Sequence, residues 1–150
     1  MVYFEDFTVG QRVAIGSVVV DEAELIAFAQ RYDPQPFHVD AEKARASIYG
    51  GRIASGWHTC AMVMRLACDA YLLQAASLGS PGVEKIEWLA PVRPGDRLSA
   101  WREVLESRPS RSKPDRGTVY TRLEAENQDG RLVMRMHAWS MFGRRPAVPA

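Results

Sequence analysis

The feature that most constrains the fold is a long apolar run at residues 57–78, WHTCAMVMRLACDAYLLQAASL. Its spacing predicts a helix that is apolar on nearly every face, because only Arg65, Asp69 and Gln74 interrupt the pattern in its middle. A helix of this kind is surrounded by other structure, whereas an amphipathic helix lies on a surface. Arg65 and Asp69 also argue against a membrane span. The rest of the chain must therefore wrap this helix.

Most of the residues available to wrap the helix lie in strand-like segments. The predicted strands span residues 12–20, 83–89, 97–107, 117–128 and 131–142. Turn signals separate them, among them PVRPGD at residues 91–96 and Asp129-Gly130 before the last strand. A helical half followed by a run of strands favours an α+β fold with an antiparallel sheet. A sheet that curls around one long central helix is the hot-dog fold, and we expect that fold here.

Two shorter helices are expected in the first third of the chain. Asp21 can cap the first, and Glu24 three residues later completes a capping-box-like pattern. This helix should end near Tyr32, because Asp33 precedes a proline and is biased away from helical geometry. The second helix is short and polar, at residues 41–47.

Composition and charge exclude several classes of protein. The chain has 150 residues, 47% hydrophobic and 25% charged, which suits a globular domain, and we expect one domain over residues 1–150. The formal net charge of +1 gives no electrostatic case for binding nucleic acid or an anionic membrane. Cys60 and Cys68 lie about 12 Å apart along the predicted helix, too far for a disulfide, and indicate core thiols. The N-terminus has no basic region followed by an apolar core, so we expect a cytoplasmic protein.

The stretch YDPQPFHVD at residues 32–40 is unusually rigid for a loop. Pro34 and Pro36 each fix φ at about −65°, so Asp33 and His38 are held with little freedom between them. Histidine can give or take a proton near neutral pH, and aspartate can orient a water molecule. We interpret the two residues as a pair that grips one water molecule. The alternative is a structural turn, because Asp before Pro commonly starts turns and a lone His often satisfies a buried hydrogen bond.

The segment Ala54-Ser55-Gly56 leads into the long helix and offers a site for an anion. The first N–H groups of a helix have no internal partner and carry positive partial charge. Ser55 is the expected N-cap, and Gly56 would let a ligand approach the backbone closely because it has no side chain. A thioester carbonyl on the Gly56 N–H would be polarised. With Asp33 and His38, this amide supplies the parts needed to add or remove water across an α,β-unsaturated thioester.

Several motifs, in order along the chain, carry a resemblance to a known family. They are FAQRYDPQPFHVD at residues 28–40, GGRIASGWHTCAMVMRL at 50–66, VEKIEWLAPVRPGDRL at 83–98 and NQDGRLV at 127–133. On these residues the sequence resembles the MaoC-like dehydratase family, which includes the (R)-specific enoyl-CoA hydratases. The resemblance implies a hot-dog fold, a place in fatty acid metabolism, and no cofactor other than coenzyme A as part of the substrate. It also implies a homodimer whose active site lies at the subunit interface.

The resemblance assigns roles to particular residues. In the family, the Asp and His of a D-x-N-P-x-H pattern are the catalytic pair, and Asp33 and His38 match them in type and spacing. The glycine that opens the central helix supplies the oxyanion amide, which maps to Gly56.

The sequence departs from the family pattern at positions expected to contact the substrate. Gln35 stands where the family motif has Asn, and Ser55 stands where many hydratases carry His. Trp57 follows the glycine and is expected near the acyl channel, where its bulk would restrict the length or shape of the chain. Arg52 either meets the ligand or faces solvent, and the sequence does not decide between the two.

The remaining histidines, the glycine pair and the basic segment are not assigned catalytic roles. We interpret His58 as a packed helix histidine and His137 as structural or interfacial, and no cluster at ligand spacing indicates a metal site. Gly50-Gly51 lacks the context of a phosphate loop and is interpreted as a loop over the active site. The basic segment RPSRSKPDRG at residues 108–117 is either solvated or in contact with the phosphates of coenzyme A, and we favour the solvated interpretation.

Three functions compete. The first is a hydratase or dehydratase that adds or removes water across C2–C3 of an enoyl- or 3-hydroxyacyl-thioester, carried by coenzyme A or an acyl carrier. The second is a hot-dog acyl-CoA thioesterase, for which the central helix offers only Asp69, far from its N-terminus. The third is a non-catalytic acyl-thioester binding module, which the departures at Gln35 and Ser55 keep open.

Overall fold

The computed structural model describes residues 1–147, so the last three residues of the expected domain lie outside the described part. The strands are Arg12–Val19 (β1), Gly82–Trp88 (β2), Arg97–Pro109 (β3), Arg116–Glu126 (β4) and Leu132–Gly143 (β5). The helices are Glu22–Tyr32 (α1), Pro36–Val39 (α2), Ala41–Ala46 (α3) and Gly56–Ala70 (α4), with 3-10 turns at Phe4–Asp6 and Leu72–Gln74.

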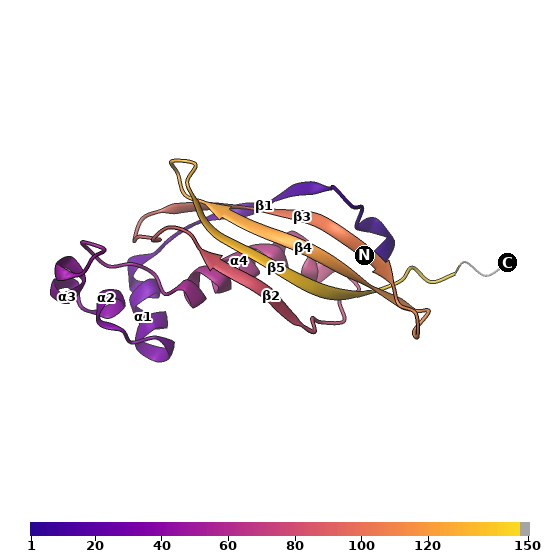
Figure 1. The fold of residues 1–150 in the computed structure, drawn as a ribbon, viewed down its shortest axis with the longest axis horizontal. Coiled ribbons are helices and arrows are strands. Elements are labelled where there is room, and N and C mark those ends of the chain that lie inside the picture. Colours follow the sequence, from indigo (N-terminus) through magenta and orange to yellow (C-terminus); the bar gives the residue numbers. More distant parts are fainter. Residues whose placement is uncertain (148–150) are drawn as a thin grey trace.

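The five strands form one sheet in the order β1-β3-β4-β5-β2, and every neighbouring pair is antiparallel. The sheet lies across α4, while α1, α2 and α3 gather beyond one end of it, as Figure 1 shows. Side chains of β4 alternate strictly between buried and half-buried positions, as expected for a strand with one face on a core. The predicted α+β architecture, an antiparallel sheet around a central helix, is confirmed.

The main core forms between α4 and the concave face of the sheet. Val63 and Ala67 of α4 are fully buried and belong to the same apolar cluster as Leu98, Leu123 and Met134 of the three central strands. Burial of such side chains stabilises the fold by roughly 1.5–3 kcal/mol each. The position of α4, and so of its N-terminal tip, is therefore fixed by the best-packed part of the molecule.

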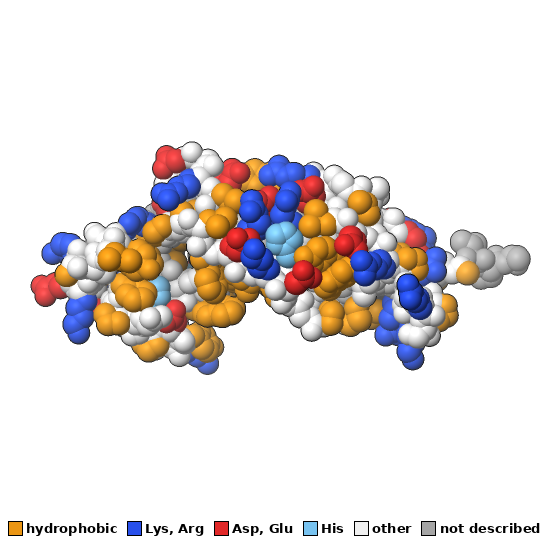
Figure 2. All heavy atoms as spheres, in the orientation of Figure 1, with side chains coloured by type: hydrophobic (Ala, Val, Ile, Leu, Met, Phe, Trp, Pro, Cys, Tyr) orange, Lys and Arg blue, Asp and Glu red, His pale blue; other side chains and the backbone are white. Residues whose placement is uncertain are grey.

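The outer face of the sheet carries charges of both signs. Arg122 of β4 pairs with Glu103 and Glu124, and Arg135 of β5 also pairs with Glu124. Figure 2 shows cationic and anionic side chains interspersed with hydrophobic ones across the middle of the molecule. Tyr120 and Trp139 stack at 4.7 Å among these charges, so this half-buried face mixes charged and aromatic side chains.

The central helix is shorter than the sequence predicts. It ends at Ala70 and not near residue 78, because Tyr71 leaves helical geometry with φ −155°. The Tyr71 ring packs edge-to-face on Phe7 at 6.1 Å and lies under the Arg102 guanidinium at 4.6 Å. These contacts with distant residues outweigh the helical periodicity of the sequence beyond that point.

The helix is also less completely wrapped than its composition predicts. Trp57 is 57% exposed and Met64 is 49% exposed, and both belong to α4. One side of the central helix is therefore uncovered in the single chain.

A further difference lies in the proline-rich stretch, which was expected to be a loop. Residues Pro36–Val39 form one helical turn, and Pro36 occupies its first position. Proline is well suited to that position because the N–H it lacks would have no helical partner there. The strands, in contrast, begin and end within two residues of their predicted bounds.

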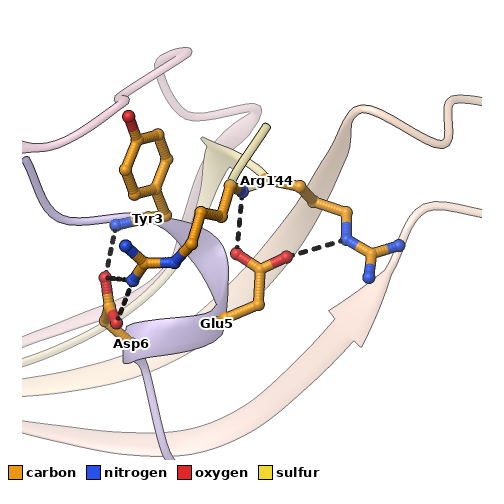
Figure 3. A network of polar contacts seen from close by, with 5 residues as sticks. Tyr3, Glu5, Asp6 and Arg144 are labelled. Carbon is orange, nitrogen blue, oxygen red and sulfur yellow. Dashed lines mark hydrogen bonds and ion pairs between the residues drawn. The ribbon is translucent and has the colours of Figure 1, made fainter. Parts of the chain in front are cut away.

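The two ends of the described chain are tied together by exposed ion pairs. Glu5 accepts a hydrogen bond from Nε of Arg144 at 3.0 Å, and Asp6 accepts from Arg145 at 2.8 Å. Figure 3 shows Asp6 also accepting from the backbone N–H of Tyr3, which closes the N-terminal 3-10 turn. The hydrogen bonds from Arg145 and Arg144 hold the pKa of Glu5 below its ordinary value. Exposed pairs of this kind contribute little stability, so they fix the path of the ends and not the fold.

Candidate active site

The junction between α1 and α2 brings Asp33 and His38 into direct contact. Asp33 is the C-cap of α1 and leaves helical geometry before Pro34, with φ −151° and ψ 69°, and His38 lies on the turn of α2 that Pro36 begins. His38 Nε2 lies 3.2 Å from Asp33 Oδ2. The sequence predicted a pair that holds a water molecule between them. At this separation the two groups contact each other directly, so a water must bind beside the pair.

The orientation of the His38 ring is set by the backbone. Its Nδ1 atom lies 2.7 Å from the carbonyl oxygen of Ile53, and a carbonyl only accepts hydrogen bonds, so Nδ1 carries a proton. His38 Nε2 faces the Asp33 carboxylate at 3.2 Å, so a proton on either group can pass to the other in a nearly buried setting.

The Asp33 carboxylate is stabilised in its charged form. Partial burial on its own would raise the pKa of Asp33, but the hydrogen bond from Gln35, the nearby Ser55 hydroxyl and His38 outweigh burial and hold the pKa below its ordinary value. The Gln35 amide Nε2 donates to Asp33 Oδ1 at 2.7 Å. Gln35, where the family has Asn, thus contacts the acid directly.

A cavity of about 420 Å³ opens beside this pair. Asp33, Gln35 and His38 line it together with Gly56 and Trp57 at the tip of α4, and apolar residues complete the lining. Its apolar lining comprises Phe37, Ile53, Trp88, Leu89, Val92 and Val133, among others. In Figure 2 apolar side chains border the hollow between the α1–α3 end and the sheet. A cavity with a mainly apolar lining and a few convergent polar groups is the usual form of a small-molecule site.

The surroundings of Gly56 differ from the expectation that a ligand would occupy the space a side chain would fill. A Cβ built on Gly56 would lie 2.3 Å from the indole of Trp88, so that space is filled by Trp88. The Trp88 indole N–H also donates to the Gly56 carbonyl at 3.0 Å. A ligand therefore cannot take that space, and Gly56 is open to a ligand where it lines the cavity.

Two other predicted residues lie outside the cavity lining. Ser55 precedes α4 as its N-cap residue, but its side chain makes no capping hydrogen bond and its hydroxyl is fully buried close to Asp33. Arg52 pairs with Glu22 at 3.0 Å and donates to the Val39 carbonyl at 3.4 Å. Arg52 therefore ties the Gly50-Gly51 segment to α1 and α2.

The remaining histidines and the cysteines lie away from the cavity lining. His58 is buried and stacks on Phe28 at 4.8 Å, with Glu24 at 3.6 Å, and burial lowers its pKa. Both cysteines are free, and burial raises the pKa of the Cys60 thiol, so it lacks the setting of a nucleophile.

Residues 1–147 hold neither a cluster of metal ligands nor a helix able to span a membrane. No three His, Cys, Asp or Glu side chains come close enough together there to hold a metal ion. None of the helices in that range has the length and apolar content needed to cross a membrane.

Sequence reasoning missed two residues of the site. Ile53, through its carbonyl, orients His38, and backbone roles of this kind leave no signal in side-chain type. Trp88 lies within the quoted motif VEKIEWLAPVRPGDRL, but its contact with Gly56 joins residues 32 positions apart. Neither contact follows from local spacing.

Together, the sheet around a central helix and the acid–base pair beside the helix tip define a hot-dog protein with a candidate acid–base site. The profile of the family described as MaoC like domain matches residues 6–127, and the chain belongs to that family. This confirms the resemblance inferred from the motifs.

Named relatives and solved structures agree with this assignment. The 3-hydroxyacyl-thioester dehydratase Z of Mycobacterium tuberculosis is 32% identical over 111 residues, which are 73% of this chain and 74% of the relative. The MaoC-like dehydratase from Rhodospirillum rubrum is 42% identical with a TM-score of 0.90, covering 98% of this chain and 100% of that one. The R-hydratase PhaJ1 from Pseudomonas aeruginosa is 26% identical with a TM-score of 0.73, covering 99% and 94%.

Proposed function

We propose that the protein is a hydratase or dehydratase that adds water to, or removes water from, the C2–C3 bond of an enoyl- or 3-hydroxyacyl-thioester. The observation that carries this proposal is the Asp33–His38 contact of 3.2 Å in the wall of a cavity that also reaches Gly56 at the tip of α4. The names of the Mycobacterium tuberculosis and Pseudomonas aeruginosa relatives support the same reaction class.

The geometry supports a specific division of roles in hydration. Asp33, held in its charged form, accepts a proton from the attacking water as the water oxygen bonds to C3. The Gly56 N–H polarises the thioester carbonyl and stabilises the enolate. His38 then delivers the proton from Nε2 to C2, and the proton taken up by Asp33 passes to His38 across their contact. The net result is one water added and the pair restored.

Both proton carriers lie on one wall of the cavity, so water and proton reach the same face of the double bond. The proposed addition is therefore syn, and we propose the (R)-3-hydroxyacyl-thioester as its product. The carrier is coenzyme A or an acyl carrier protein, both of which present the same thioester.

We also propose that two copies of the chain pair to complete the site. β2 is an edge strand, paired with β5 on one side and with no strand of residues 1–147 on the other. Trp57 and Met64 of α4 and Val83 of β2 are about half exposed. An open strand edge beside exposed apolar side chains is suited to association with a second copy.

The competing thioesterase interpretation is not favoured by the structure. Its carboxylate would be Asp69, which lies in the last turn of α4 and pairs with Arg65 at 2.9 Å. The binding-module interpretation depended on the Gln35 and Ser55 departures, yet both residues favour the charged form of Asp33.

The test is hydration of but-2-enoyl-CoA, followed by loss of the conjugated enoyl absorbance. We expect Asp33→Asn and His38→Ala each to reduce kcat/KM by at least about 100-fold while circular dichroism remains native. Asp69→Asn and His137→Gln are matched controls outside the cavity and should retain the wild-type rate. If short, long and branched enoyl-CoAs all remain unchanged by the wild-type protein, the proposed function is wrong.

A further inference from the structure

The Trp88 side chain lies directly on the tip of α4. It ends the edge strand β2, and its indole atoms Cε2, Cδ2 and Nε1 lie 2.3–2.6 Å from the position a Cβ on Gly56 would take. Its Nε1 donates to the Gly56 carbonyl at 3.0 Å, and Trp57 packs edge-to-face against it at 5.3 Å. The first turn of α4 is thus clamped to the end of the sheet.

The contact between Trp88 and Gly56 points to a role in the site and not in folding, because Trp88 is not a core residue. It is 46% exposed, so its removal would leave little internal void, yet it lines the same cavity as Asp33 and His38. The hydrogen bond to the Gly56 carbonyl restrains the rotation of the first peptide units of α4. The indole also fills the space beside Gly56 that a Cβ would take, so neither water nor ligand can occupy that flank. A donor in a drier and more rigid setting polarises a carbonyl more strongly.

We propose that Trp88 is a positioning residue that fixes the direction of the Gly56 N–H and shields it from water, so that the carbonyl of a bound acyl thioester is polarised. The inference rests on the proposed function, because it takes Gly56 as the amide that meets the thioester carbonyl. Trp88 itself neither gives nor takes a proton.

The direct readout is the carbonyl stretching frequency of bound butanoyl-CoA labelled with 13C at the thioester carbon, measured by infrared difference spectroscopy. This saturated ligand has no double bond to hydrate, so the readout does not require turnover. We expect the wild-type protein to lower the frequency relative to free ligand and Trp88→Ala to show less than about half of that shift. Trp88→Phe retains a ring over Gly56 without the N–H and should lie between the two.

Steady-state kinetics supply a second test, because a residue with a merely structural role would not lower kcat while leaving KM nearly unchanged. With but-2-enoyl-CoA we expect Trp88→Ala to lower kcat about tenfold, with KM changed less than about threefold, because polarisation matters most in the transition state. The matched control is Trp101→Ala, which removes a tryptophan of β3 that contacts Arg12 at 5.0 Å and does not line the cavity. It should leave both the carbonyl shift and kcat at wild-type values.

The outcomes separate this inference from the proposed function. An equal carbonyl shift in wild type and Trp88→Ala overturns the inference even if the enzyme hydrates its substrate, and so does the absence of any shift in the wild-type protein. A shift that depends on Trp88 upholds the inference even if no enoyl-CoA is hydrated. If Trp88→Ala does not fold, Trp88→Leu takes its place, and an undiminished shift in that variant overturns the inference.

Discussion

At the scale of single residues, the site depends on the contacts that stabilise the Asp33 carboxylate in its charged form. The Gln35 amide supplies a 2.7 Å hydrogen bond to one carboxylate oxygen, and His38 contacts the other at 3.2 Å. Both contacts favour the charged carboxylate over the neutral acid, against the effect of partial burial. Gln35, which departs from the family asparagine, therefore supports the charge of the acid directly.

This arrangement predicts a pH-dependent effect of Gln35→Leu. Because the pKa of Asp33 is lowered on folding, its contribution to stability is complete above the unfolded pKa of about 3.9 and disappears as pH falls through the lower folded value. Loss of the Gln35 amide raises the folded pKa. The difference in free energy of unfolding between wild type and variant should therefore be larger at pH 7 than at pH values near 2.

Urea unfolding at a series of pH values measures this difference. Gln74→Leu, which changes an exposed glutamine on the 3-10 turn after α4, is the control and should show no such pH dependence. A Gln35→Leu effect of the same size at every pH would contradict the account of the Asp33 pKa.

The types and spacing of the site residues were readable from the sequence, but their contacts only in part. Pro34 and Pro36 correctly indicated a rigid segment that would hold Asp33 close to His38. The sequence could not give the Ile53 carbonyl or the Trp88 indole, because both contacts depend on tertiary packing.

At the scale of elements, α4 shows where local pattern succeeds and fails. Its start at Gly56 follows the predicted entry motif, and its burial against β3, β4 and β5 follows its apolar composition. The end of α4 differs from the prediction, because Tyr71 leaves the helix and packs against Phe7 and Arg102. The strands were easier to predict because turn residues mark their ends.

The packing of β2 on α4 predicts a strong effect of Gly56→Ala on stability. The added methyl group would overlap the Trp88 indole, and overpacking of this kind costs about 1–3 kcal/mol. In a Trp88→Ala background the overlap is absent, so the same substitution should cost much less. A double-mutant cycle of urea unfolding free energies measures this coupling.

Gly51→Ala provides the matched control for this cycle. Its Cβ would meet only the end of the Arg93 side chain at 3.5 Å, an ordinary contact, so little change is expected. Additive effects of Gly56→Ala and Trp88→Ala would show that the glycine is needed for a reason other than Trp88.

At the scale of the whole molecule, the single chain leaves one side of its central helix and the β2 edge of its sheet uncovered. The sequence predicted a helix wrapped on every side, and the exposed Met64 and Trp57 show that one chain does not achieve this. A single sequence cannot separate residues buried within a chain from those buried between chains, because both are apolar.

We therefore expect the protein in solution to have the mass of two chains, measured by light scattering after size exclusion. Met64→Lys places a charge on the uncovered side of α4 and should shift the mass toward one chain. Val9→Lys is the control, because Val9 is similarly exposed but lies in the turn before β1, the edge strand at the other side of the sheet from β2. A wild-type protein of one-chain mass at assay concentrations would contradict the proposed pairing.

The central claim is that Asp33 and His38 act on a thioester whose carbonyl rests on the tip of α4. The most direct measurement is a crystal structure of Asp33→Asn with but-2-enoyl-CoA bound. The account predicts the carbonyl oxygen at about 2.7–3.1 Å from the Gly56 nitrogen, with C2 within about 3.5 Å of His38 Nε2 and room for one water between residue 33 and C3. An acyl group bound elsewhere, or with its carbonyl directed away from Gly56, would contradict it.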